Sequence, residues 1–157
     1  MKYGPHKSSL FDLDANIAAM LVYLLPLLLG FVSDSLSAVA WIIPLLAFIM
    51  EKNSSFVTYH AANSLAFYVI DAIIFVISTI LGITAVLTSW VSNIAFVGMI
   101  SIGITGFLFL FIGLIFLVIE IYLFVGKVIC AIKAYEYQEN HFAIIDRITA
   151  FILNLKR

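Results

Sequence analysis

The sequence contains little charge and almost no cysteine. Only 11% of its 157 residues are charged, 64% are hydrophobic, and the mean hydropathy is +1.18. This balance lies far outside that of water-soluble domains and predicts a membrane protein. The formal net charge of −1 provides no basic field for nucleic acid, and Cys130 has no second cysteine for a disulfide or a metal cluster. We therefore expect the lipid bilayer as a partner, and neither nucleic acid nor a cofactor.

Sequence patterns typical of enzymes are also missing. The chain has no Gly-x-Ser-x-Gly, no His-Glu-x-x-His and no paired-aspartate helix motif. No small-residue cleavage site follows a short apolar stretch near the N-terminus, so residues 1–13 are predicted to be an uncleaved cytoplasmic lead-in. We expect a non-enzymatic protein with a single membrane domain over residues 1–157.

Long apolar stretches are present instead. A helix needs about 20 apolar residues to cross the hydrocarbon core. Four stretches approach that length: residues 14–31, 35–50, 60–90 and 100–132. The fold class predicted is all-α: a bundle of four transmembrane helices over residues 14–132, followed by a cytoplasmic amphipathic tail at 133–157.

The positions of Lys and Arg predict the orientation. Cations precede the first apolar stretch, lie between the second and third, and follow the fourth, whereas the two opposite connections have none. These cations are Lys2, Lys7, Lys52, Lys133, Arg147, Lys156 and Arg157. The positive-inside tendency then places both termini in the cytoplasm of a multi-pass protein of the cell membrane.

The tail has apolar residues at helical spacing but is too short to span a bilayer. Two placements fit the pattern equally well. The helix lies on the cytoplasmic membrane surface, or it packs on the bundle. Its apolar residues are Ile144, Ile145, Ile148, Phe151, Ile152 and Leu155.

Three ionisable residues interrupt the apolar stretches: Asp71, Glu120 and Lys127. An isolated charge at the bilayer centre costs at least about 2.5–3.5 kcal/mol, and a facing opposite charge reduces that cost. We expect an ion pair between Asp71 and Lys127 that ties the third helix to the fourth. The alternative is a proton or solute pathway lined by all three residues.

The predicted cytoplasmic loop before the third helix contains Glu51 and Lys52, and His60 follows about one turn inside that helix. Ser54 or Ser55 is expected to cap the helix. A structural hydrogen bond is the leading role for His60, and a proton-sensing or ligand-contacting role is the main alternative. A metal site with Glu136, Glu139 and His141 lacks diagnostic spacing, so no metal site is predicted.

Three segments carry a family resemblance: "NIAAMLVYLLPLL", "WIIPLLAFIMEKNSSFVTYHAANSLAFYVI" and "ICAIKAYEYQENHFAII". They resemble a widespread prokaryotic family of small membrane proteins, a domain of unknown function numbered 4870. That family is related to the Tic-type import subunit of the chloroplast inner envelope and to small magnetosome membrane proteins. The most specific part is FVTYHAAN, which ends at Asn63 and is similar to the family's Phe-Val-x-Phe-His-Ala-x-Gln.

The resemblance covers Leu13 to Ile148 and implies a four-helix membrane bundle with His60 at the cytoplasmic start of the third helix. Gln138, Glu139 and Ala143 depart from the Gly-Glu pair and the Pro that many relatives have there. Asp71 is not part of the family pattern. The resemblance implies no defined chemistry.

Two functions remain open from the sequence. The first is a non-enzymatic subunit, assembly factor or scaffold of a membrane complex, formed with copies of itself or with another membrane protein. The second is an oligomeric transporter or channel component, with a polar pathway around Asp71, Glu120 and Lys127. Four helices in one chain leave little room for a pore, so the second function requires oligomerisation.

Overall fold

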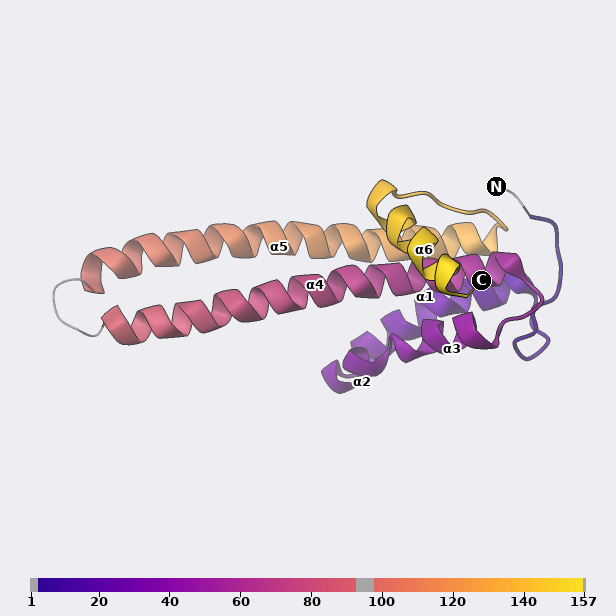
Figure 1. The fold of residues 1–157 in the computed structure, drawn as a ribbon, viewed down its shortest axis with the longest axis horizontal. Coiled ribbons are helices and arrows are strands. Elements are labelled where there is room, and N and C mark those ends of the chain that lie inside the picture. Colours follow the sequence, from indigo (N-terminus) through magenta and orange to yellow (C-terminus); the bar gives the residue numbers. More distant parts are fainter. Residues whose placement is uncertain (1–2, 93–97, 157) are drawn as a thin grey trace. The chain divides into compact units, whose positions relative to one another are not determined.

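The protein is all-helical over residues 3–92 and 98–156, which are the residues that the computed structural model describes. No strand occurs in this part of the chain, and Lys7 and Asp14 form an isolated antiparallel bridge. This confirms the predicted class. The helices are α1 (Ala15–Val32), α2 (Asp34–Val39), α3 (Ile42–Met50), α4 (Ser55–Ser92), α5 (Gly98–Tyr135) and α6 (Ala143–Leu155) (Figure 1).

Three segments are long and apolar enough to cross a membrane: Ala15–Val32, Ser55–Leu87 and Gly106–Tyr135. They indicate a membrane-spanning protein. The second predicted span, residues 35–50, is divided between α2 and α3, so a count of four spans is not confirmed. Residues 1–2, the predicted connection at 93–97 and the terminal Arg157 lie outside the described residues.

The break between α2 and α3 follows from Pro44. Proline has no N–H and clashes with the carbonyl four residues before it, which here belongs to Ala40. Proline is tolerated in the first turn of a helix, where its N–H would have no intrahelical partner. Accordingly α2 ends at Val39, and Pro44 lies in the first turn of α3. The stretch predicted as one helix is therefore two helices, with Pro44 near the start of the second.

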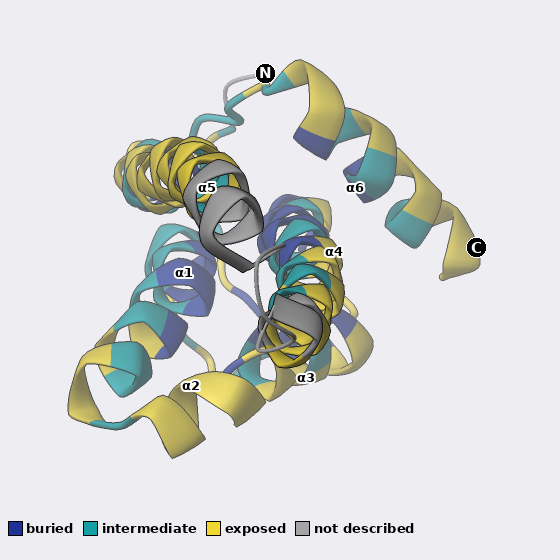
Figure 2. Ribbon diagram, turned by 90° about the vertical axis from the view of Figure 1, so that its left-hand side faces the viewer, coloured by how far each residue is buried: buried dark blue, intermediate teal, exposed yellow. Residues whose placement is uncertain are grey.

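Residues 15–50 form a helical hairpin, because α1 packs against both α2 and α3. Ser33 accepts a hydrogen bond from the Ser35 amide at 3.2 Å and caps the N-terminus of α2. All of α2 is exposed, and its residues are yellow along the whole helix in Figure 2.

The chain divides into two compact units: Met1–Val69 with Phe124–Arg157, and Ile70–Leu123. Nearly all buried residues belong to the first unit. In the second unit, only Ile74 and Leu123 are buried among the side chains that the structure describes. Exposed residues such as Phe75, Ile80, Leu110 and Leu117 make the described surface of the second unit apolar, as expected for helices surrounded by lipid or by other helices.

The lead-in is an ordered part of the first unit from Tyr3 onward. The Tyr3 amide donates to the Tyr137 carbonyl at 2.9 Å, and its hydroxyl donates to Glu139 at 2.8 Å. His6 Nε2 lies 2.7 Å from the Ser54 hydroxyl. Hydrogen bonds to the chain between α3 and α4, and to the chain after α5, thus hold the lead-in in place.

Candidate functional site

Four polar side chains from three helices meet inside the first unit: Tyr23 of α1, His60 and Asn63 of α4, and Thr149 of α6. Each is at most 1% exposed. The Tyr23 hydroxyl lies 3.1 Å from His60 Nδ1 and donates to Asn63 Oδ1 at 3.0 Å. Asn63 Nδ2 donates to the Thr149 hydroxyl at 3.3 Å, and Thr149 donates to the Ile145 carbonyl at 2.9 Å. We call these four residues the polar core.

The Tyr23 hydroxyl stands between two groups of the polar core. It has one proton, for which Asn63 Oδ1 and His60 Nδ1 are both within hydrogen-bond distance. The tautomer of His60 decides whether Nδ1 accepts from Tyr23 or donates to it. Nε2 is buried, and the His60 ring lies close to the main chain of Gln138.

The polar core joins α1, α4 and α6 through hydrogen bonds between side chains. Tyr23 and Thr149 both hydrogen-bond to Asn63, and Thr149 donates to the Ile145 carbonyl of its own helix. A buried hydrogen-bonded network favours one arrangement of the elements that contribute to it. His60 thus lies at hydrogen-bond distance from a tyrosine hydroxyl, and its structural role stays a prediction.

Tyr23→Phe is expected to destabilise the first unit by about 1–2 kcal/mol, because it removes the buried hydroxyl that pairs with His60 and Asn63. The measurement is thermal unfolding of the purified protein in detergent, followed by circular dichroism. Tyr122→Phe is the matched control, since Tyr122 is 56% exposed. Equal melting temperatures for the two variants would contradict the role of Tyr23.

A second buried hydrogen-bond network centres on Glu51, at the C-terminus of α3. We call it the Glu51 network. Its carboxylate is fully buried and accepts hydrogen bonds from the Ser8 hydroxyl, from the amide and hydroxyl of Ser9, and from the amides of Asn53 and Ser54. The Ser54 amide is 2.8 Å from Oε1, and the Ser9 hydroxyl is 2.9 Å from the same oxygen. One side chain therefore ties the lead-in to the connection between α3 and α4.

These donors keep Glu51 ionised. Burial alone would raise the pKa of the carboxyl, but the hydrogen bonds from Ser8, Ser54 and Ser9 outweigh that effect and lower the pKa to about 2. The Lys156 ammonium donates to the main-chain carbonyls of Phe48 and of Glu51, the latter at 2.6 Å. A cation at the last carbonyls of a helix is favourable, so the end of α6 caps α3.

Ser54 caps α4, as one of the two predicted alternatives. Its hydroxyl accepts from the Val57 amide at 3.1 Å, and the Thr58 amide donates to its carbonyl at 3.1 Å. Because α4 begins at Ser55, both His60 and Asn63 lie inside the helix rather than in the preceding loop. Lys52 remains in that loop, exposed, and its amide donates to the Ser9 hydroxyl at 2.9 Å.

The two intramembrane carboxylates lie near the middle of two apolar segments. Asp71 is sixteen residues from each end of Ser55–Leu87, and Glu120 lies at the centre of Gly106–Tyr135. Glu120 is exposed on the surface of this single chain, and Asp71 is half-buried. A helix that crosses a membrane along such a segment places its middle residues deepest in the bilayer.

The Lys127 ammonium lies 4.8 Å from the centre of the Tyr68 ring, within the first unit. This distance is typical of a cation–π contact. Asp71 belongs to the second unit, so the ion pair between Asp71 and Lys127 stays a prediction.

The residues weighed for a metal site have other contacts. Glu136 pairs with Lys133 at 3.1 Å, and His141 pairs with Asp146 at 3.2 Å and with Glu139 at 4.0 Å. Among the described residues, no group of three His, Cys, Asp or Glu side chains is arranged to hold a metal ion.

The tail helix α6 combines features of both predicted placements. Ile145 and Thr149 are buried against the first unit, whereas Ile144, Phe151 and Leu155 are each at least 65% exposed. The exposed three recur at intervals of seven and four residues and therefore share one face of the helix. One face of α6 packs on protein, and a separate apolar face is exposed to a membrane surface or a partner.

The sequence analysis did not identify several residues of the polar core and of the Glu51 network: Ser8, Ser9, Tyr23 and Thr149. Ser8 and Ser9 precede the first helix by several residues and carry no motif. Tyr23 and Thr149 could have been selected as candidates, because each carries a hydroxyl group on a mainly apolar helix. Only the fold shows that both hydroxyls lie beside Asn63.

Comparisons with known proteins gave no match: no protein-family model, no curated protein and no solved structure is similar to this chain. The family resemblance described above therefore stays a prediction.

Proposed function

We propose that the protein is a non-enzymatic membrane subunit or scaffold that acts through contacts with copies of itself or with another membrane protein. The observation that carries this proposal is the exposure of Glu120 at the centre of an apolar segment. Its helix neighbours Leu117, Val118 and Ile121 are exposed apolar residues. The carboxylate thus lies on a surface that otherwise suits lipid.

A carboxylate facing lipid at mid-depth is costly, by at least about 2.5–3.5 kcal/mol for an acidic residue on insertion scales. A second helix with a polar group at the same depth lowers that cost by hydrogen bonding, whatever contacts Glu120 makes within its own chain. The exposed face of α6 offers a further contact surface near the polar end of the first unit. Both features support a protein that functions in an assembly.

The cell membrane and cytoplasmic termini remain part of this proposal. They rest on the distribution of Lys and Arg, of which Lys7, Lys52, Lys133 and Lys156 belong to the first unit.

Replacing Glu120 by leucine is expected to weaken the assembly. Interhelical polar contacts in membranes contribute about 0.6–1.7 kcal/mol, which corresponds to roughly a threefold to twentyfold loss of association. Native mass spectrometry of protein gently extracted from its own membrane measures the assembled fraction. Glu136→Leu serves as the control, because Glu136 follows the end of α5 and pairs locally with Lys133. A monomeric wild-type protein, or an unchanged assembly in Glu120→Leu, would count against the proposal.

A transporter or channel component is the second candidate. Asp71 and Glu120 lie near the middle of their apolar segments, and carboxylates at that depth are enriched along proton and ion pathways. Proton flux into liposomes that stops with Asp71→Asn would favour this function. Vesicles that conduct no ions with a confirmed oligomer inserted would rule it out.

A further inference from the structure

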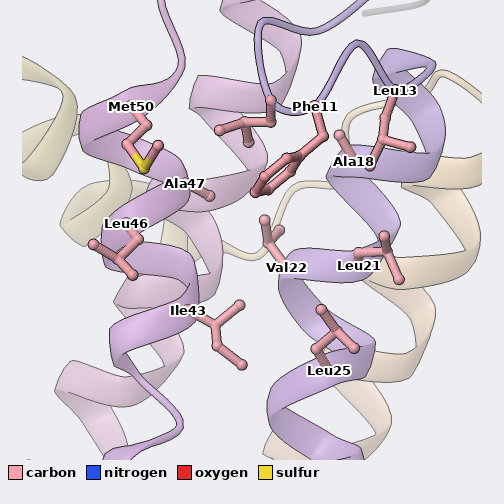
Figure 3. Close-up of a pocket in the computed structure, with 11 residues that line it drawn as sticks. Phe11, Leu13, Ala18, Leu21, Val22, Leu25, Ile43, Leu46, Ala47 and Met50 are labelled. Carbon is pink, nitrogen blue, oxygen red and sulfur yellow. The ribbon is translucent and has the colours of Figure 1, made fainter.

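We propose that the groove between α1 and α3 binds one acyl chain of a phospholipid, with Phe11 closing its mouth. The groove has a volume of about 230 Å³. Val22 and Leu25 line it from α1, Ile43 and Ala47 line it from α3, and Leu10 and Phe11 from the lead-in cover one end (Figure 3). This inference is independent of the proposed function.

The chemistry of the groove selects an apolar chain. All its lining residues have apolar side chains, so a polar ligand would find no side-chain donor or acceptor there. Each methylene group buried contributes about 0.8 kcal/mol when it leaves water. The rim residues Leu25, Leu46 and Met50 are at least 40% exposed, so the apolar lining continues outward onto the surface of the hairpin.

The occupant follows from where the groove lies. One wall belongs to α1, a helix long and apolar enough to cross a membrane, and the other belongs to the short apolar helix α3. Acyl chains are the apolar ligands that surround such helices. One end of the groove lies beside polar segments of the protein, since Glu51 follows α3 directly and the lead-in precedes α1. An amphiphile would place its apolar chain in the groove and its polar head beside these segments.

Phe11 is held at the mouth by a strained turn. Phe11 and Asp12 have φ angles of 53° and 56°, a left-handed conformation that costs non-glycine residues roughly 1–2 kcal/mol each. The Phe11 side chain is 88% exposed, and Figure 3 shows its ring directed between Val22 and Ala47. An exposed aromatic ring on a strained turn contributes nothing to a protein core, but it can cover a bound chain.

Contacts at the base of the turn hold this conformation. The Lys7 ammonium lies 3.0 Å from the Asp14 carboxylate and donates to the Asp12 carbonyl at 3.2 Å. The Ser8 amide donates to the Leu13 carbonyl at 2.9 Å, and Glu51 binds Ser8 and Ser9.

The test uses a phospholipid with a photoactivatable diazirine on one acyl chain, incorporated into bilayers with the full-length protein. We expect crosslinks concentrated in residues 10–25 and 43–50. Ala47→Phe fills the groove and should reduce those crosslinks at least tenfold. Leu117→Phe changes an exposed residue of the second unit and should leave them unchanged. Undiminished crosslinking in Ala47→Phe would overturn the proposal, because it would show only surrounding lipid.

A second variant covers the case in which Ala47→Phe fails to fold. Phe11→Ala removes an exposed side chain, so the fold should be retained while the mouth opens. Native mass spectrometry after detergent exchange should show one retained phospholipid per wild-type chain and a severalfold lower occupancy in Phe11→Ala. Equal occupancy in both, or crosslinks from the groove to a second copy of the chain in place of lipid, would contradict the assignment.

Discussion

Glu51→Ala is expected to destabilise the first unit by on the order of 3 kcal/mol or more. The substitution removes the acceptor of five donor groups, and Ser8 and the Ser54 amide are themselves buried. Each buried donor left without a partner costs about 1–3 kcal/mol. The lead-in also loses its anchor at α3, so the strained turn that carries Phe11 should relax. Thermal unfolding in detergent and proteolysis of the lead-in measure the two effects.

The pH dependence gives an independent check on Glu51. Its pKa is about 2 in the folded protein and ordinarily 4.5, so the stabilisation is fully present above pH 4.5 and is lost as the pH falls towards 2. Glu51→Gln cannot titrate, and its stability should vary less over that range. Glu136→Gln is the control at an exposed acid. Parallel pH profiles of stability for the wild type and Glu51→Gln would contradict the stabilising role of ionised Glu51.

Gly126→Leu is expected to cost about 2–3 kcal/mol. A Cβ atom at Gly126 would lie 3.0 Å from Cε1 and 3.3 Å from Cζ of Phe67, closer than side chains normally approach. Phe67 is 1% exposed and cannot move without displacing its neighbours, among them Phe142 at a ring-centre distance of 6.2 Å. Overpacking of this kind costs about 1–3 kcal/mol, and leucine adds more atoms than a methyl group.

Gly113→Leu is the matched control on the same helix. A Cβ atom at Gly113 has nothing within 4 Å, and replacing a helical glycine removes a penalty of roughly 0.5–1 kcal/mol. The control should therefore be neutral or slightly stabilising. Phe67→Leu combined with Gly126→Leu should recover part of the lost stability, since it frees space at the contact. Identical melting temperatures for Gly126→Leu and Gly113→Leu would show that α4 and α5 do not pack closely there.

Much of the helical architecture follows from local signals in the sequence. The apolar stretch at 14–31 predicts α1 to within one residue at each end, because a charged lead-in and a serine-rich turn bound it. The start of α4 was less certain, since Ser54, Ser55 and His60 all fit a helix beginning. The division of 35–50 was missed because its apolar pattern is continuous and only Pro44 indicates an interruption.

The candidate site was predictable only in part. His60, Asn63 and Glu51 stood out because polar residues beside or within apolar stretches require partners. Their partners could not be identified, because Tyr23 is 37 residues from His60, Thr149 is 86 from Asn63, and Ser8 is 43 from Glu51. Contacts at such separations depend on how helices pack. The exposed face of α6 illustrates the same limit, since periodicity alone did not show which apolar residues pack inward.

Cysteine accessibility tests the central claim, that the second unit lies within a bilayer, most directly. In a Cys130→Ala background, Lys52→Cys and Leu117→Cys are reacted with a membrane-impermeant maleimide in sealed vesicles of both orientations. Both positions are exposed in the single chain, so burial within the chain does not distinguish them. The account predicts that Lys52→Cys reacts in one orientation, whereas Leu117→Cys reacts in neither until the protein is denatured. Equally fast labelling of both cysteines in intact vesicles would contradict it.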